Sequence, residues 1–395
     1  MYKETFDLAA FRAVVISTLA MGVGASMGFI PGFLATTLQN DLGIKLGQIG
    51  LLVSVHFGAT GIGSILGGRI CERFGARSAV ATDAAVVGVF SLLAAYFGSY
   101  WMLLLAAVPA GFSYSLANAG TNVAVAKAVP ENRRTVSLSI KTSGVPIMAA
   151  IASAMGPWVA SEWSWETVMA LNGVVALIVC LLAVLVLESD RLGQDTRSST
   201  QRLPNKFIWF PIGAFLLIAG TQPLFSWSVP YLEQSLDAAP AVAGGVVSIA
   251  SLLGVVVMIF NGFRTDLLGS EQRINRMVKM LLLASFSVLI VPSALVVGLW
   301  AAVLGIVVGL ISQLVAIGVM HAALVDRAPY AVARATGMTM TGYYLGALFS
   351  PVGFGALVDL TDTYAYVWVV MSALLFLSVP AFLLAGRIPV IRQDD

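Results

Sequence analysis

The fold of this chain is decided by one short polar stretch, Gly68-Arg69-Ile70-Cys71-Glu72-Arg73-Phe74-Gly75-Ala76-Arg77, which joins two long apolar segments. Its glycines permit a tight turn and a close approach of helices, and its acid and bases can pair at a helix end. A weaker copy, Gly262-Phe263-Arg264-Thr265-Asp266-Leu267-Leu268-Gly269, joins two apolar segments in the second half of the chain. A polar turn that recurs between apolar segments predicts two related halves.

The apolar segments around these turns are long enough to cross a membrane. Of 395 residues, 58% are hydrophobic and 11% are charged, a charged fraction roughly half of that in soluble proteins. A spanning helix needs about 20 mostly apolar residues, and barrel strands would be shorter and alternate in polarity. The sequence therefore predicts an all-α membrane protein with 12 transmembrane helices, at about 12–38, 47–69, 78–98, 101–127, 135–160, 166–187, 208–232, 242–263, 277–297, 300–325, 333–358 and 365–386.

Lysine and arginine predict the orientation of these helices. Most of the 22 basic residues lie in alternate loops or at the chain ends, whereas the opposite loops carry Lys45 and a set of acids. Since cytoplasmic loops are enriched in Lys and Arg, we expect both termini in the cytoplasm and a multi-pass protein of the cell membrane, the inner membrane in a Gram-negative cell. One basic residue is left over, Lys141, which lies inside the fifth span.

The longest polar stretch divides the spans six and six. We expect a cytoplasmic linker at 188–207 between an N-terminal six-helix bundle, 1–187, and a C-terminal six-helix bundle, 208–395. When the sequences of the two halves are aligned, glycines, acids and prolines coincide, such as Gly68 with Gly262 and Pro130 with Pro329. Two such units with the same in/out sense are related by an axis along the membrane normal, and they hold a substrate at their interface near the midplane.

The turn at 68–77 resembles the G-x-x-x-[DE]-[RK]-x-G-x-[RK] signature of the major facilitator superfamily, in the loop where that family carries it, and the copy at 262–269 also lies as in the family. The resemblance covers the twelve spans, the linker and both motif copies. It implies a transporter that works by alternating access. It also implies a latch that joins the halves when the cytoplasmic side is closed, made by Gly68, Glu72, Arg73, Gly75, Arg77 and Asp266. The alternative is that the arginines only anchor the topology.

The same resemblance places spans 1, 4, 7 and 10 around a central cavity, with spans 2, 5, 8 and 11 along the seam. Polar side chains deep in these spans are candidates for binding, because an unpaired polar group that faces lipid is costly. Each of them could instead bond between helices without touching a substrate. We expect substrate binding by Lys141, Tyr114, Asn118, Gln222, Trp227 and Gln313.

Lys141 predicts the charge of the substrate. Its stem could extend back to the cytoplasmic edge, or it could face the cavity as a cation with no acid on spans 1, 4, 7 or 10. A cavity with a cation and no anion favours an anionic substrate. The run 141–146 is also faintly similar to the span-5 segment of the cyanate-transporter-like branch of the superfamily, which favours small anions.

Candidates for coupling to protons are His56 in span 2, His321 in span 10 and Asp83 in span 3, which is close enough to the cytoplasmic edge to pair with Arg77 or Arg133. The arginine that many proton-coupled members of the superfamily carry in span 4 is absent. We expect uptake of a small organic or inorganic anion by proton symport through one of the histidines, or by exchange against a counter-anion.

Other functions stay open at this point. Span 5 keeps the Gly156-Pro157 pair and loses other glycines of a motif found in drug/proton antiporters of the superfamily, which leaves proton-coupled efflux of drugs or metabolites as the alternative. A non-transporting membrane sensor would keep the scaffold and lose the cavity. No enzyme is expected, because no nucleophile with a base and no phosphate-binding loop is found. Two cysteines and two histidines predict no metal, and we expect no cofactor, no nucleic acid and a monomer in the bilayer.

Overall fold

The computed structural model describes residues 8–188, 203–268 and 272–390, and within them the chain is helical. The first half comprises α1 (Leu8–Ser26), α2 (Ile30–Phe33), α3 (Ala35–Leu42), α4 (Leu46–Phe74), α5 (Ala76–Phe97), α6 (Tyr100–Ala128), α7 (Glu131–Thr142), α8 (Gly144–Glu162) and α9 (Trp165–Val186). The second half comprises α10 (Trp209–Leu236), α11 (Pro240–Leu268), α12 (Arg273–Ile290), η2 (Val291–Ser293), α13 (Ala294–Val297), α14 (Leu299–Arg327), η3 (Pro329–Ala331), α15 (Val332–Thr361) and α16 (Ala365–Gly386).

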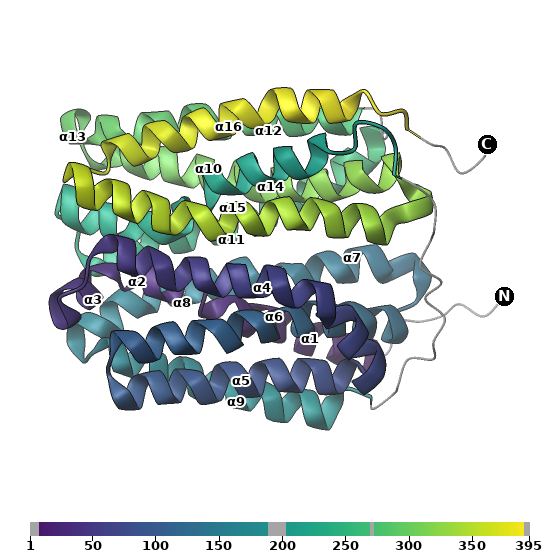
Figure 1. Cartoon of the computed structure of the whole chain (residues 1–395), viewed down its shortest axis with the longest axis horizontal. Helices are drawn as coiled ribbons and strands as arrows, with labels where there is room; N and C mark the ends of the chain where they lie inside the picture. Colours follow the sequence, from purple (N-terminus) through teal and green to yellow (C-terminus); the bar gives the residue numbers. More distant parts are fainter. Residues whose placement is uncertain (1–7, 189–202, 269–271, 391–395) are drawn as a thin grey trace.

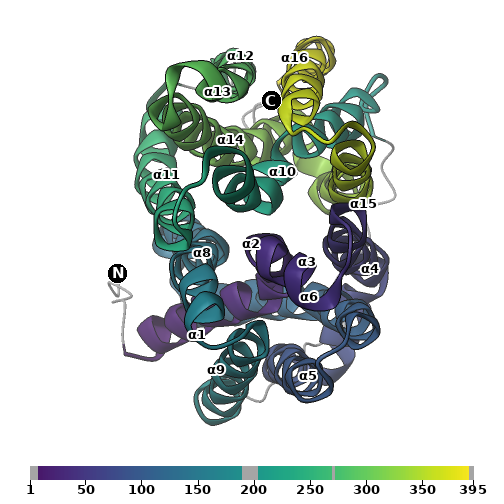
Figure 2. The same cartoon turned by 90° about the vertical axis from the view of Figure 1, so that its left-hand side faces the viewer.

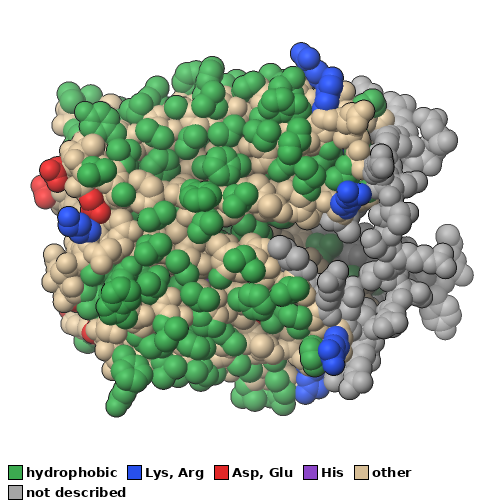
Figure 3. Space-filling view, viewed as in Figure 1, with side chains coloured by type: hydrophobic (Ala, Val, Ile, Leu, Met, Phe, Trp, Pro, Cys, Tyr) green, Lys and Arg blue, Asp and Glu red, His purple; other side chains and the backbone are tan. Residues whose placement is uncertain are grey.

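Twelve segments of the described chain are long and apolar enough to cross a membrane, which confirms the predicted fold class. Large apolar side chains are exposed along the sides of the bundle, as lipid contact requires. Figure 3 shows Lys and Arg gathered at one end, and Asp and Glu with a single basic side chain at the other. We call these the basic end, where α1 begins and α16 ends (Figure 1), and the acidic end, which carries Asp41, Glu233, Asp359 and Asp362.

The helices form two halves with a seam on either side (Figure 2). α4 packs against α15, and α8 packs against α11. These are the second, eleventh, fifth and eighth spans, so the expected seam helices are confirmed. Both seams are tight towards the acidic end, where a side chain on Gly244 of α11 would collide with the carbonyl of Ser153 on α8. Near the basic end Figure 3 shows a hollow between the halves.

Two spans that were expected to be continuous are broken. The first span divides into α1, α2 and α3, and the fifth divides into α7 and α8 at Ser143. Pro31 lies at the start of α2, after the first break, and Pro146 lies near the start of α8, after the second. Because proline has no backbone N–H, each removes one hydrogen bond from the helix. Hydropathy alone shows no break, because the broken segments are as apolar as the intact ones.

The Gly244 contact predicts that alanine substitutions at two neighbouring glycines change the stability of the protein by different amounts. Replacing Gly244 by Ala places a methyl group against the Ser153 carbonyl, whereas a Cβ on Gly245 meets no atom within 4 Å. We expect Gly244→Ala to lower the stability by about 1–3 kcal/mol, the usual effect of overpacking, and Gly245→Ala to leave it unchanged. The midpoints of thermal unfolding in detergent measure this. Equal midpoints would contradict the tight seam.

Candidate functional site

The side chain of Lys141 turns inward from α7 and lies 2% exposed. Its Nζ donates to Asn122 Oδ1 at 2.8 Å and to Asn118 Oδ1 at 3.2 Å, both on α6. The two asparagines are four residues apart, so they lie on one face of their helix. The lysine is therefore held by two amides inside the protein and does not extend to the basic end.

The charge of this lysine has no counterion among the residues that the structure describes. An ammonium has three N–H donors, and the two bonds to neutral amide oxygens leave one donor and the whole positive charge. Buried charges are normally paired. Asn122 is exposed and Asn118 is partly exposed, so the ammonium lies next to accessible space. A bound anion would complete this arrangement.

The second half of the chain brings aromatic and imidazole groups towards this lysine. His321 on α14 has an exposed side chain and lies within electrostatic range of Lys141. Its Nδ1 is 2.8 Å from the carbonyl of Ile317. Because a carbonyl only accepts, Nδ1 carries a proton and Nε2 remains available. Tyr344 on α15 lies within reach of Asn118, and its ring meets that of Tyr343 edge to face.

A second group of buried polar residues lies deeper in the first half. Asp83 on α5 is fully buried, and its Oδ1 accepts a hydrogen bond of 2.8 Å from Ser113 Oγ on α6. Its Oδ2 has no partner in the described chain. The expected pairing with Arg77 is therefore wrong, because the carboxyl points to α6 and into the bundle. The side chain of Arg133, the other expected partner, lies outside the described part of the structure. It fits there because Gly24 on α1 has no side chain to displace it.

Tyr114 and His56 belong to this second group. The Tyr114 ring stacks on the His56 ring with centroids 6.1 Å apart, and it also lies beside Gly24. His56 is fully buried, and within the part of the chain that the structure describes neither of its ring nitrogens has a hydrogen-bond partner. Tyr114 is thus next to Asp83 and His56, one helical turn before Asn118. It connects the two polar groups along α6.

The structure places Gln222, Trp227 and Gln313 apart from Lys141, on α10 and α14 of the second half. All three are buried, and Trp227 Nε1 and Gln313 Oε1 have no partner among the described residues. None of them bonds to the lysine. Their role in substrate binding stays a prediction. Asn122 was not among the expected binding residues, although its place on the same face as Tyr114 and Asn118 could have indicated it.

The glycine turn between α4 and α5 has the expected form. Gly75 has φ +85°, a conformation that suits glycine, and its N–H donates to the Cys71 carbonyl. Arg73 is exposed over the Phe74 ring, and Arg77 is half-buried. The side chains of Glu72 and Asp266 lie outside the described part of the structure, so the latch stays a prediction.

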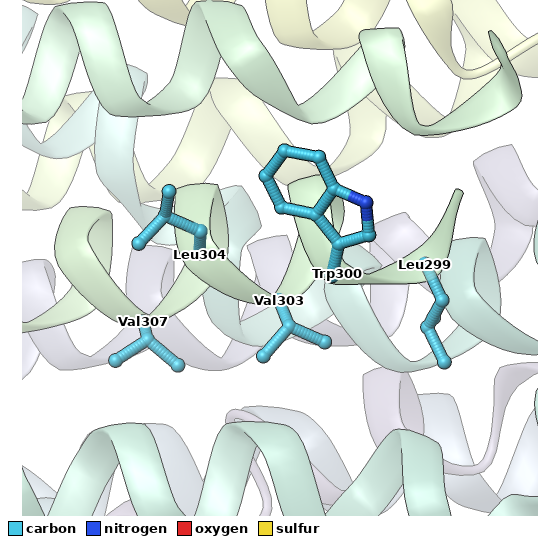
Figure 4. A pocket seen from close by; sticks show the side chains of 5 residues that line it. All are labelled: Leu299, Trp300, Val303, Leu304 and Val307. Carbon is cyan, nitrogen blue, oxygen red and sulfur yellow. The ribbon is translucent and has the colours of Figure 1, made fainter. Parts of the chain in front are cut away.

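A groove of about 550 Å³ lies on the outer surface of α14 (Figure 4). It is lined by Leu299, Trp300, Val303, Leu304 and Val307. Trp300 is 63% exposed. An apolar groove on the side of a spanning helix is suited to lipid and offers a charged substrate no partner. In the described residues no cluster of three His, Cys, Asp or Glu side chains could hold a metal ion.

Comparison with known proteins places the chain among membrane transporters. Residues 14–351 match the family model described as Major Facilitator Superfamily. The chain is 26% identical over 177 residues to the 4-hydroxybenzoate transporter of Acinetobacter baylyi, covering 44% of this chain and 39% of that protein. It is 25% identical over 220 residues to the gentisate transporter of Corynebacterium glutamicum, covering 51% and 49%. The chain thus spans less than half the length of these curated relatives.

Solved structures agree with the fold. A D-xylose-proton symporter superposes with a TM-score of 0.76 at 16% identity, covering 94% of this chain and 97% of that one. The inward open conformation of the xylose transporter from E. coli gives a TM-score of 0.78 at 13% identity, covering 97% of each chain. At these identities the likeness concerns the fold alone.

The Lys141 geometry predicts different losses of stability for two substitutions of Asn122. Asn122→Ala removes the shorter bond to a charged group, which we expect to lower the free energy of unfolding by about 1.5–3 kcal/mol. Asn122→Asp keeps an acceptor and adds a counterion, so most of that stability should remain. Thermal unfolding in detergent measures both, with the exposed Asn40→Ala as control. If Asn122→Ala unfolds like Asn40→Ala, the bond is not stabilising.

Proposed function

The chain belongs to the major facilitator superfamily, and from that premise we propose that it is a secondary transporter for the uptake of a small organic anion by alternating access. The family and the matched relatives are transporters and not enzymes. The basic end is assigned to the cytoplasm, since Lys and Arg gather there. Uptake then runs from the acidic end to the basic end, and the transporter works as a monomer.

The main observation in favour of an anionic substrate is the positive charge of Lys141, which has no counterion among the described residues. Its ammonium is bound by two neutral amides, one of them on the exposed Asn122, and lies within electrostatic range of the exposed His321 of the other half. A cationic substrate would be repelled there, and a neutral one would leave the buried charge unpaired. A carboxylate can take the remaining N–H of the ammonium and neutralise it. The alternative was proton-coupled efflux of drugs or metabolites, and the same charge argues against it for cationic drugs.

The surroundings of Lys141 support an aromatic acid with a hydroxyl group. Tyr343 and Tyr344 offer ring edges and faces against which an aromatic ring packs. His321 offers Nε2 as a hydrogen-bond partner for a phenolic hydroxyl. The names of several relatives, the transporters for 4-hydroxybenzoate, gentisate, gallate and 3-(3-hydroxy-phenyl)propionate, all specify hydroxylated aromatic acids. The cation takes the carboxylate, and the groups from the second half take the ring.

Proton symport is the coupling that we propose, with Asp83 as the proton carrier. Asp83 is a buried carboxyl, and among the described residues one of its oxygens has no hydrogen-bond partner. Ionisable groups in this setting inside a membrane are usually functional. Tyr114 links it along α6 to the asparagines that hold Lys141. His56 lies on the other side of Tyr114 and remains a second candidate, as does His321 at the cavity.

The first test concerns the anion. Vesicles containing the purified protein are assayed for uptake of labelled 4-hydroxybenzoate. We expect Lys141→Ala to lower uptake at least tenfold, because the lost charge-assisted bond contributes about 1.5–3 kcal/mol. Lys141→Arg should retain part of it, since the guanidinium keeps the charge but not the shape. The exposed Lys279→Ala serves as control. Unchanged uptake in Lys141→Ala would exclude the proposed site.

The second test concerns coupling. Asp83→Asn keeps the size and the bond to Ser113 but cannot ionise. We expect it to abolish accumulation driven by an imposed pH gradient while exchange of labelled against unlabelled substrate continues at near the wild-type rate. The same pair of assays on His56→Gln tells the two candidates apart. If Asp83→Asn accumulates substrate normally, Asp83 is not the carrier. If accumulation by the wild-type protein does not depend on the pH gradient but requires an anion inside the vesicles, the mechanism is anion exchange and not proton symport.

A further inference from the structure

At the beginning of α4, at the acidic end, the Gln48 side chain accepts from the Lys45 amide at 3.0 Å, but α4 offers no acceptor for its next two amides. A helix starts with backbone N–H groups that have no partner within the helix, and a side chain before the first turn normally accepts from one of them. The residue in that position here is Lys45, whose ammonium has no acceptor. The amides of Leu46 and Gly47 must therefore find their partners elsewhere.

Asp359 of the other half supplies both partners. Its Oδ1 accepts from the Leu46 amide at 3.0 Å, and its Oδ2 accepts from the Gly47 amide at 2.7 Å. Hydrogen bonds to a carboxylate are stronger than neutral ones. The positive end of the α4 dipole adds to the attraction. One side chain of α15 thus completes the first turn of a helix that lies about 310 residues earlier in the chain and in the opposite half.

Asp359 is badly placed for its own helix. It lies in the last turn of α15, which ends at Thr361. The negative end of the α15 dipole is there, so a carboxylate at this position is unfavourable for α15. Lys45 is equally unsuited to the start of α4. The gain from Asp359 therefore comes only from the contact between the halves, and it is lost when the halves separate.

The backbones around Asp359 meet closely. A side chain on Gly355 of α15 would collide with the Leu46 carbonyl, and a Cβ on Gly47 would lie 3.0 Å from Asp359 Oδ2. Further along the same seam, Ser54 Oγ on α4 accepts from the amide of Val352 on α15 at 3.1 Å. Small side chains thus let the two helices approach closely enough for a short carboxylate to reach two amides.

Neutral side chains surround this contact at the acidic end. Gln234 on α10 donates to Thr36 at 3.0 Å and to Gln39 at 2.8 Å, both on α3, and it accepts from Tyr364 Oη at 2.9 Å. Burial and the charges of Asp359 and Glu233 raise the pKa of Tyr364, so it stays a neutral donor. Glu233 on α10, whose carboxyl bonds to Thr36 on α3, is a second acid at this end. Among the described bonds that join the halves here, those of Asp359 are the ones in which a carboxylate accepts from backbone amides.

We propose that Asp359 is the lock of the gate at the acidic end. Its carboxylate holds the N-terminus of α4 and has to release two amides before the cavity can open on this side. The lock presupposes alternating access, which belongs to the proposed function, but it depends on no particular substrate.

The test measures how often the acidic-end seam opens. Ser54, which is fully buried in that seam, is replaced by Cys in a protein whose Cys71 and Cys180 have been changed to Ser. The purified protein in lipid nanodiscs is treated with a hydrophilic maleimide, and the rate of labelling is followed. Asp359→Asn removes the charge, and its amide nitrogen faces a backbone donor. Asp362→Asn is the matched control, because Asp362 is exposed, lies three residues further on and makes no bond to α4.

We expect Asp359→Asn to label about ten times faster than the parent, in keeping with the loss of one charge-assisted bond. Asp362→Asn should label at the parent rate, and Asp359→Glu, which keeps the carboxylate, should lie between them. Equal rates in Asp359→Asn and Asp362→Asn would overturn the lock. If Asp359→Asn labels faster than the parent but the parent takes up no 4-hydroxybenzoate, the role of Asp359 is supported and only the proposed substrate is wrong.

A measurement on the unmodified protein covers the case in which Asp359→Asn does not fold. Hydrogen–deuterium exchange of the segment 46–50 reports on the amides that Asp359 accepts from. We expect these amides to exchange at least tenfold more slowly than those at the start of α12, where no side chain caps the helix. Exchange at the same rate in both places would show that the contact is open most of the time and would overturn the lock.

Discussion

Within a membrane every polar group of the chain has to find its partner inside the protein, because the hydrocarbon supplies none. The helices satisfy this requirement for the backbone of the twelve spans, and serine and threonine hydroxyls that bond to carbonyls one turn earlier satisfy it for many side chains. Against this background three ionisable exceptions within the first half are informative. Among the residues that the structure describes, Lys141 has a charge without a counterion, Asp83 has an oxygen without a hydrogen-bond partner, and His56 has two such nitrogens.

These exceptions are distributed unevenly between the halves. The charged and ionisable groups of the site lie mainly in the first half, on α4, α5, α6 and α7, whereas the second half contributes His321 and neutral polar or aromatic groups. Two units that share one repeat have therefore become different in chemistry while keeping the same arrangement of helices. In the proposed transport cycle the first half holds the substrate charge and the proton, and the second half closes over the ring of the substrate.

Much of the fold could be predicted from the sequence, and the reasons are local. The spans follow from apolar length, and the turn at Gly75 follows from a glycine between charged residues at a helix end. The breaks at Ser143 and after Ser26 could not be read from hydropathy, because a broken span is as apolar as a straight one. Asp83 was expected to face Arg77, since distance along the chain favoured it, but the space left by Gly24 on another helix decided its direction. The contact of Asp359 with α4 depends on how the two halves meet, and no local pattern contains that information.

The break in the fifth span gives Lys141 a mechanical position as well as a chemical one. The lysine lies two residues before Ser143, where α7 ends and α8 begins. The α8 side of this joint is fixed, because Gly144 packs directly on the Thr18 carbonyl of α1. α7 is the shorter arm, and the ammonium sits at its inner end. In the proposed transport cycle the anion therefore binds within two residues of the joint between α7 and α8, so the binding site and the break in the span coincide.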